Sequence, residues 1–265
     1  MRFALNHIAA PQMPLPDFLA MAQRLGMTDI EIRNDLPDDI GTIPPRALRE
    51  MAGDTGVRIL TINGLYPFNL WSDDLASRAA RLADYAAEAG IGALVMCPLN
   101  DGRMVEHSHV VDALHHLHAI LKARGIMGYV EPLGFRRSSL RRKNEAIAAI
   151  TEAGGFDHFA LVHDTFHHRL AGEDRLYPHR TALVHVSGVV DPQIPLEALE
   201  DEHRELIDHR DLLDNLGQLR ALLADGYEGP ISFEPFSPET HANPNIEIAL
   251  AESMGFLRRA LNENG

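Results

Sequence analysis

The amino-acid sequence predicts an α/β protein, a (β/α)8 barrel formed by a single domain over residues 1–265. Eight short runs have the apolar, β-branched character of strands, and most of them are followed by a longer segment with the apolar spacing of a helix. Such alternation is typical of a parallel sheet, and eight units in 265 residues match the size of this barrel. An open doubly wound sheet is the alternative. No GxGxxG sequence follows the first run, so the barrel is preferred.

The predicted strands are short, and several of them end in a polar residue. In chain order they are FALNH (3–7), DIEIR (29–33), RILTIN (58–63), ALVMC (93–97), MGYVE (127–131), ALVHD (160–164), ALVHVS (182–187) and PISFE (230–234). No Gly/Ser-rich or low-complexity linker separates two halves of this series, so a single domain is expected.

The predicted helices occupy the segments between the strands. FLAMAQRLG carries an apolar stripe and ends at Gly26, a residue type that often stops helices. The next helix is expected to open at Pro44 and Pro45, because proline is tolerated in the first turn. Little helix is expected over residues 166–179. The other helices are predicted over residues 73–89, 105–124, 139–153, 212–225 and 243–261.

The composition argues against several classes of protein. The formal net charge of −14 and the pI near 5.4 oppose an extended nucleic-acid-binding surface, which needs clustered Lys and Arg. Cys97 is the only cysteine, so neither a disulfide framework nor a cysteine-based zinc site is expected. The N-terminal apolar stretch is short for a signal peptide, and no run approaches the roughly 18 apolar residues of a membrane span. A cytoplasmic protein without membrane or nucleic-acid partners is expected.

Two charged segments have open interpretations. A basic run is interpreted as the solvated start of a helix, with a pocket-facing position as the alternative; it consists of Arg136, Arg137, Arg141, Arg142 and Lys143. The long acidic segment 189–210, after the seventh strand, is interpreted as a mobile lid or as a contact between subunits of a homo-oligomer. A charged surface in solvent would explain this segment without any function.

Polar residues at the ends of four consecutive predicted strands form the candidate site. They are Glu131, Asp164, His185 and Glu234, on strands five to eight. Barrel enzymes place their chemistry at the carboxyl ends of the strands, where these side chains can converge. Three carboxylates and one imidazole suit Mn²⁺, Mg²⁺ or Co²⁺, and Zn²⁺ can occupy such a set as well. The sequence therefore predicts one divalent metal ion at the mouth of the barrel.

The segments around these residues are EPLGF, HDTFHH, HVSG and ISFEPF, and in this order they resemble the xylose-isomerase-like TIM-barrel superfamily of sugar isomerases and epimerases. The similarity extends to FALNHIAA, IEIRNDLP, LTINGLYPFN and VMCPLNDG, and so spans most of the chain. Within the superfamily, the 2-keto-myo-inositol isomerases of inositol catabolism are the group that it resembles most. The resemblance implies an enzyme of carbohydrate metabolism that acts on a small polyol or keto-sugar.

The resemblance also implies roles for individual residues. Glu131, Asp164, His185 and Glu234 would bind the metal ion, and Glu131 and Glu234 would in addition carry the proton. His167, in a loop just above the metal, would hold a substrate oxygen.

Arg204 corresponds to an arginine that contacts substrate in relatives. The Pro-Gly motif that usually follows it is replaced here by Glu205, Leu206 and Ile207, which indicates an altered loop. Arg210 is a competing candidate for the same role.

Further polar residues lie at or just past the ends of the first four strands, where a hydroxyl-rich ligand would find hydrogen-bonding partners. Asn6 and Asn63 are taken as substrate-binding residues, and the group also includes His7, Glu31, Arg33 and Asn100. Phe68 and Trp71 are interpreted either as an apolar wall beside the sugar ring or as core residues.

The predicted reaction moves a carbonyl to a neighbouring carbon through an enediolate. A divalent metal would stabilise the developing charge as a Lewis acid, and a carboxylate on each face of the substrate would act as base and then as acid. A keto-inositol dehydratase, a hydroxypyruvate isomerase and a ketose 3-epimerase remain alternatives, because a fold does not select among such substrates. A DNA repair endonuclease on this scaffold would need more histidine ligands and a basic face. A non-catalytic sugar-binding barrel would not need the complete ligand set.

Overall fold

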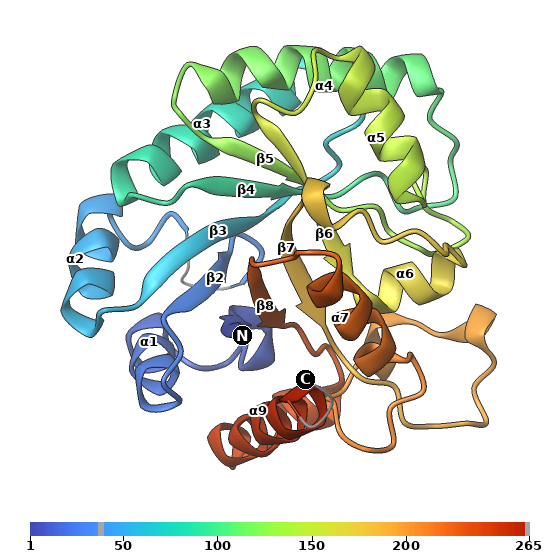
Figure 1. Cartoon of the computed structure of the whole chain (residues 1–265). Helices are drawn as coiled ribbons and strands as arrows, with labels where there is room; N and C mark the ends of the chain where they lie inside the picture. Colours follow the sequence, from blue (N-terminus) through green and yellow to red (C-terminus); the bar gives the residue numbers. More distant parts are fainter. Residues whose placement is uncertain (37–39, 263–265) are drawn as a thin grey trace.

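Eight parallel strands close into a barrel in the computed structural model, which describes residues 1–36 and 40–262. Each strand pairs with the next along the chain, and β8 pairs with β1 to close the sheet (Figure 1). The predicted (β/α)8 barrel is confirmed. The strands are β1 (Arg2–Asn6), β2 (Asp29–Arg33), β3 (Arg58–Leu65), β4 (Ala93–Met96), β5 (Met127–Val130), β6 (Phe159–Asp164), β7 (Thr181–Val186) and β8 (Pro230–Phe233).

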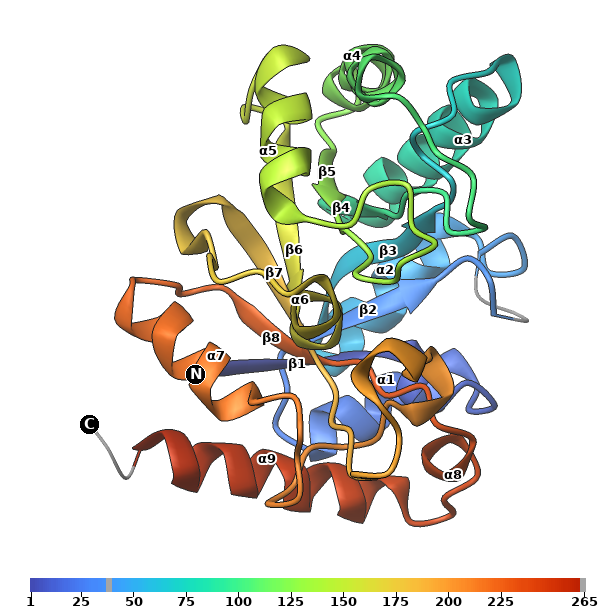
Figure 2. The same ribbon diagram turned by 90° about the vertical axis from the view of Figure 1, so that its right-hand side faces the viewer.

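Helices surround the barrel. On the outside, α9 lies below α7 and α1 (Figure 2) and joins α1 through an ion pair of 2.7 Å between Arg24 and Glu247. The α-helices are α1 (Leu15–Arg24), α2 (Pro45–Thr55), α3 (Asp73–Ala89), α4 (His107–Lys122), α5 (Lys143–Glu152), α6 (Thr165–Ala171), α7 (Asn215–Ala224), α8 (Pro238–His241) and α9 (Ile246–Asn262). Four 3-10 helices complete the described elements: η1 (His7–Ala9), η2 (Pro178–Arg180), η3 (Leu196–Ala198) and η4 (Asp201–His203).

Local sequence explains where α3 begins and ends. The Ser72 hydroxyl accepts the backbone N–H of Leu75 at 3.1 Å and so caps the first turn. Gly90 follows the last turn with φ of 78°, a left-handed conformation that glycine adopts without a steric penalty. The predicted bounds of this helix, residues 73–89, are therefore confirmed.

Side chains along the strands alternate between the helix layer and the barrel interior. On β2, Ile30 and Ile32 join the apolar core that the barrel shares with the helices. Glu31, between them, reaches across the barrel and contacts His185 of β7 at 3.0 Å. The barrel therefore carries polar groups inside it, within an apolar outer layer.

A segment predicted to contain little helix begins with α6. The Asp164 carboxylate accepts the backbone N–H of His167 at 2.9 Å and caps the helix directly at the end of β6. With only seven residues, α6 is too short to show an apolar period, so sequence pattern could not reveal it. The prediction is wrong for residues 166–171. His167 consequently lies in the first turn of a helix and not in a loop.

The structure also shows where α5 begins and how Phe68 and Trp71 pack. Helix α5 begins at Lys143 rather than at residue 139, because residues 134–142 form a loop after β5. Phe68 is completely buried in the main core, and the Trp71 ring stacks on His116 of α4 with centroids 4.4 Å apart. Both aromatic residues thus fit the core interpretation.

In the part of the chain that the structure describes, no helix has both the length and the apolar character required to cross a membrane.

Candidate metal centre

The four predicted strand-end residues meet at the mouth of the barrel. Glu131 directly follows β5, Asp164 ends β6, His185 lies near the end of β7, and Glu234 directly follows β8. Asp164 is in register with His185, so these neighbouring strands end at the same level. One potential ligand atom from each of the four lies within 4.8 Å of those of the others, and all four side chains are buried. The barrel therefore brings the four predicted metal-binding residues together.

His185 presents its two ring nitrogens to different partners. Nδ1 lies 2.8 Å from Oε1 of Glu131 and 3.2 Å from Oε2 of Glu234, so it faces the cluster. Nε2 lies 3.0 Å from Oε1 of Glu31, behind the ring. Because Glu31 favours a proton on Nε2, the lone pair of Nδ1 would be available to a metal ion.

Glu31 is held in this position by two hydroxyl groups. Ser232 donates to Oε1 at 2.6 Å, Thr61 donates to Oε2 at 2.7 Å, and the Glu31 side chain is completely buried. The position of Glu31 near the end of the second predicted strand suggests that it faces a hydroxyl-rich ligand. The structure turns it instead towards His185, where it orients a candidate ligand.

Arg204 lies against two of the candidate ligands. Its Nη2 donates to Oδ2 of Asp164 at 2.6 Å and to Oε2 of Glu234 at 2.9 Å, and its side chain is almost fully buried. The Arg204 carbonyl accepts the backbone N–H groups of Phe236 and Ser237, each at 2.8 Å, which anchors this part of the chain beside the end of β8. The structure thus places Arg204 at the site.

The competing Arg210 lies elsewhere. Its guanidinium is exposed and pairs with Asp208 at 2.6 Å. Arg204 is therefore the arginine that the β7–α7 connection, residues 187–214, delivers to the barrel mouth.

Buried charges in the cluster compensate one another. Burial alone would raise the pKa of Glu234, but the charges of His185 and Arg204 hold the pKa below its usual value. Burial alone would lower the pKa of His185, but Glu234, Glu31 and Glu131 raise it well above its usual value. The carboxylates therefore require nearby positive charge. Without an ion the protonated His185 ring and the Arg204 guanidinium supply it, and a bound cation would replace the proton on Nδ1 of His185.

Three residues from the first strands donate to one oxygen of Glu234. Oε1 accepts from Asn6 at 3.0 Å and from Asn63 at 3.4 Å, and Nη1 of Arg33 also lies 3.4 Å away. Asn6 and Asn63, predicted to bind substrate, thus border the cluster and at the same time orient its strand-8 carboxylate. Arg33 pairs in addition with Asp35 at 2.7 Å.

His7 and Asn100 contribute less directly. The His7 ring lies 2.9 Å from the Met13 carbonyl oxygen and 4.3 Å from the Phe18 ring, so it stabilises the β1–α1 connection. The Asn100 backbone N–H donates to the Tyr66 hydroxyl at 3.3 Å.

Cys97 is a neighbour of the cluster that sequence reasoning did not assign to it. Its Sγ lies 3.4 Å from Oε2 of Glu131, and burial together with the Glu131 charge raises the pKa of the thiol well above its usual value. The neutral thiol therefore donates to Glu131. The sequence feature that indicates a place near the cluster is the position of Cys97 at the end of the fourth predicted strand.

His167 lies beside the cluster with an unused polar atom. Its backbone N–H donates to the Asp164 carboxylate, which caps α6. Its ring packs edge-on against the Phe135 ring, with the two centroids 5.1 Å apart. Nδ1 of His167 is buried, and among the described residues no group hydrogen-bonds to it. A buried polar atom without a partner is costly, and a ligand hydroxyl would satisfy it.

The residues present fit a divalent cation. Three buried carboxylates and one imidazole nitrogen form an oxygen-rich donor set of the kind that binds such ions. Glu131, Asp164, Glu234 and Nδ1 of His185 would hold the ion, and Glu31 would fix the ring of His185 from behind.

Comparison with known proteins places the chain in a family. Residues 19–260 match the family model described as xylose isomerase-like TIM barrel. A crystal structure of a xylose isomerase domain-containing protein from Salmonella typhimurium LT2 is 36% identical, with a TM-score of 0.91 over 98% of this chain and 97% of that one. A search of curated proteins gives no significant match.

Two more distant structures share the fold. An IolI protein with a bound zinc atom is 20% identical, with a TM-score of 0.87 over 99% of each chain. A D-psicose 3-epimerase from Clostridium cellulolyticum H10, solved with D-tagatose, is 13% identical, with a TM-score of 0.76 over 98% of this chain and 99% of that one.

Proposed function

The chain belongs to the xylose isomerase-like TIM-barrel family, and on that premise we propose that it is a divalent-metal-dependent isomerase of a polyol or keto-sugar. The observation that carries the proposal is the pair Glu131 and Glu234, whose oxygens both lie within 3.2 Å of Nδ1 of His185. Two carboxylates around one candidate metal position can serve a reaction that removes a proton and returns it to the neighbouring carbon.

The side chains have distinct parts in the proposed reaction. The ion, when bound, supplies Lewis-acid polarisation of the substrate carbonyl and its neighbouring hydroxyl oxygen. Glu234, kept ionised by the charge of Arg204, would accept the proton from the carbon next to the carbonyl. Glu234 would then return this proton to the neighbouring carbon, while Glu131 would take the proton of the neighbouring hydroxyl and pass it to the former carbonyl oxygen, so that both carboxylates are regenerated. Arg204 adds a fixed positive charge where the enediolate oxygens develop negative charge.

The substrate class is proposed from the donors around the cluster. Asn63 and His167 offer an amide and an imidazole group to a ligand rich in hydroxyls, and each would fix its orientation by a directional hydrogen bond. Asn6, predicted to bind substrate, instead uses its amide on Glu234, Glu31 and the Ile8 backbone, so it would act by orienting Glu234. A keto-inositol is the proposed type of substrate, and a hydroxypyruvate isomerase would use the same proton transfer. A ketose 3-epimerase would begin with the same proton removal but return the proton to the same carbon from the opposite face. A keto-inositol dehydratase would release a product lighter by one water.

Solvent exchange tests the proposal. Metal-loaded protein is incubated in D₂O with keto-inositols, ketoses and hydroxypyruvate, and the substrates are analysed by mass spectrometry and NMR. We expect deuterium at the carbon next to the carbonyl of one substrate. If the protein binds metal and a sugar but no compound gains deuterium or changes mass, the isomerase proposal is wrong and a sugar-binding barrel is favoured.

A matched pair of variants tests the role of Glu234. Glu234→Gln removes the proton acceptor while keeping the side-chain size, and the exchange rate should fall by at least about 10²-fold. Glu239→Gln makes the same chemical change at an exposed position of α8 and should leave the rate unaltered. Near-normal exchange by Glu234→Gln would reject Glu234 as the base.

A further inference from the structure

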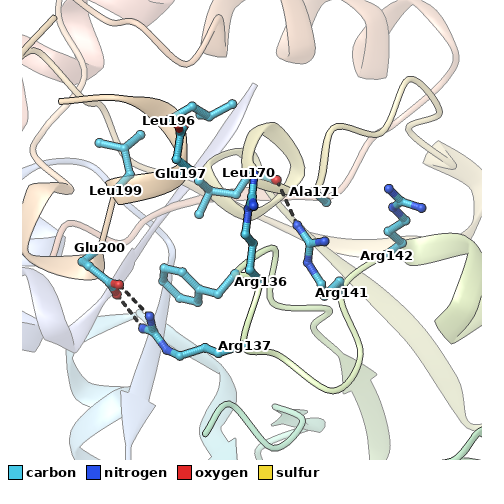
Figure 3. A pocket seen from close by; sticks show the side chains of 11 residues that line it. Arg136, Arg137, Arg141, Arg142, Leu170, Ala171, Leu196, Glu197, Leu199 and Glu200 are labelled. Carbon is cyan, nitrogen blue, oxygen red and sulfur yellow. Dashed lines mark hydrogen bonds and ion pairs between the residues drawn. The ribbon is translucent and has the colours of Figure 1, made fainter. Parts of the chain in front are cut away.

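A cavity of about 540 Å³ lies beside the proposed active site and is rich in arginine. It opens between the loop of residues 134–142, the end of α6 and the segment 196–200 (Figure 3). We call it the arginine pocket. Its walls carry the guanidinium groups of Arg136, Arg137, Arg141 and Arg142 and the apolar side chains of Leu196 and Leu199.

The loop that carries the arginines is firmly held. Leu133 donates its backbone N–H to the Leu140 carbonyl at 3.1 Å, which brings the two ends of the loop together. Gly134 lies so close to the His167 carbonyl that a side chain there would collide with the backbone of α6. The loop therefore presents its arginines from a defined position, which lowers the entropic cost of binding a ligand.

Two of the four arginines maintain the walls. Arg137 pairs with Glu200 of the opposite wall at 2.6 Å and lies over the Phe135 ring, 4.3 Å from its centroid. Arg141 donates to the Gly134 carbonyl at 2.9 Å and to the Leu170 carbonyl at 3.3 Å, which joins the loop to α6. The Glu200 carboxylate offsets the charge of Arg137, whereas Arg141 keeps its charge because its partners are neutral carbonyl groups.

The other two arginines are available to a ligand. Arg136 and Arg142 are exposed, and no ion pair holds either of them among residues 1–36 and 40–262. Figure 3 shows the Arg136 side chain between those of Arg137 and Arg141. Four arginines face only Glu197 and Glu200 in the lining, so the pocket is positive in a protein whose net charge is −14. Such a local excess attracts an anion that the rest of the surface repels.

From this arrangement we infer that the arginine pocket binds the phosphate group of a small molecule. Guanidinium groups match the geometry of phosphate oxygens and bind them through paired, charge-assisted hydrogen bonds. The cavity volume is that of a small-molecule site, and Leu196 and Leu199 would cover the carbon skeleton of the ligand. Phe135, which contacts both Arg137 and His167, forms the wall shared with the proposed active site.

Calorimetry on the metal-free protein tests the inference. The probes are fructose 6-phosphate and inorganic phosphate, with fructose as the uncharged match. We expect both phosphate compounds to bind, and the affinity to fall as salt is raised. The double variant Arg136→Gln/Arg142→Gln should weaken binding at least about 10-fold, because charge-assisted hydrogen bonds are lost.

A second double variant provides the control. Arg81→Gln/Arg259→Gln removes the same charge from exposed positions on α3 and α9 and should retain the wild-type affinity. Equal affinity of wild type and Arg136→Gln/Arg142→Gln would overturn the inference, as would no binding of either phosphate compound. Poly-glutamate is titrated as a further probe. If it binds and neither phosphate compound does, the pocket is assigned to an acidic protein segment and the inference is overturned.

The exchange assay distinguishes two sources of the phosphate group. If the substrate carries it, fructose 6-phosphate should gain deuterium faster than fructose, and inorganic phosphate should compete. If a separate regulator carries it, inorganic phosphate should change the exchange rate of an uncharged substrate. Binding is measured without metal or turnover, so failure of the isomerase proposal would leave this inference standing.

Discussion

At the scale of single residues, the candidate centre depends on a carboxylate outside the four ligands. Glu31 accepts from Ser232 and Thr61 and faces Nε2 of His185, so its position is set from three directions. Such a partner orients a histidine ligand and raises its basicity. The contact joins residues 154 positions apart, which no local sequence pattern could reveal.

Glu31→Gln should weaken metal binding by about 10–100-fold, because it removes the charge behind His185 while keeping the side-chain shape. Titration of the metal-free variant with Mn²⁺ measures the effect directly, and Glu239→Gln is the control. Unchanged affinity in Glu31→Gln would show that His185 does not depend on Glu31 for its orientation.

Substitution of Asp164 should affect metal binding, whereas substitution of His167 should affect substrate binding and turnover. Asp164→Asn removes a ligand charge but retains a side chain that can cap α6, so metal affinity should fall while the fold persists. His167→Ala should keep its metal and instead raise KM, lower kcat or change both, because its ring would contact only the substrate. Calorimetric metal titration beside steady-state kinetics separates the two. If His167→Ala loses metal to the same extent, His167 is a ligand.

At the scale of elements, α5, β6 and α6 enclose a second buried group of titratable side chains. Lys143 of α5 donates to Nδ1 of His168 at 2.6 Å and lies 3.3 Å from Glu173. Burial, reinforced by the Lys143 charge, lowers the pKa of His168 from its ordinary 6.5 to about 3. Burial also lowers the pKa of Lys143 to about 8. His168 is therefore neutral in the folded protein.

This group predicts a dependence of stability on pH. Between pH 6.5 and 3 the unfolded chain binds a proton at His168 that the folded protein excludes, so the free energy of unfolding falls as the pH falls. His168→Gln should reduce that slope by about one proton, or about 1.4 kcal/mol per pH unit. Urea denaturation across this range measures it, with His109→Gln at an exposed position of α4 as the control. Equal slopes in wild type and His168→Gln would contradict the assignment.

At the scale of the whole molecule, the sequence predicts the barrel well because short strand-like runs alternate with helical segments eight times and several of the runs end in a polar residue. Glu131, Asp164, His185 and Glu234 could be placed together because parallel strands end on one side of a barrel. Features that arise only when distant segments meet could not be predicted. The arginine pocket is one of them, since its Arg137–Glu200 ion pair spans 63 positions and closes two loops against each other.

We propose that Glu131, Asp164, His185 and Glu234 together hold one catalytic metal ion. A crystal structure of the protein soaked in Mn²⁺, with the ion located by anomalous scattering, tests it most directly. We predict one ion per chain, bonded to Glu131, Asp164, His185 and Glu234 at about 2.0–2.6 Å. An ion bound elsewhere, with all four side chains more than about 3 Å from it, would contradict the claim.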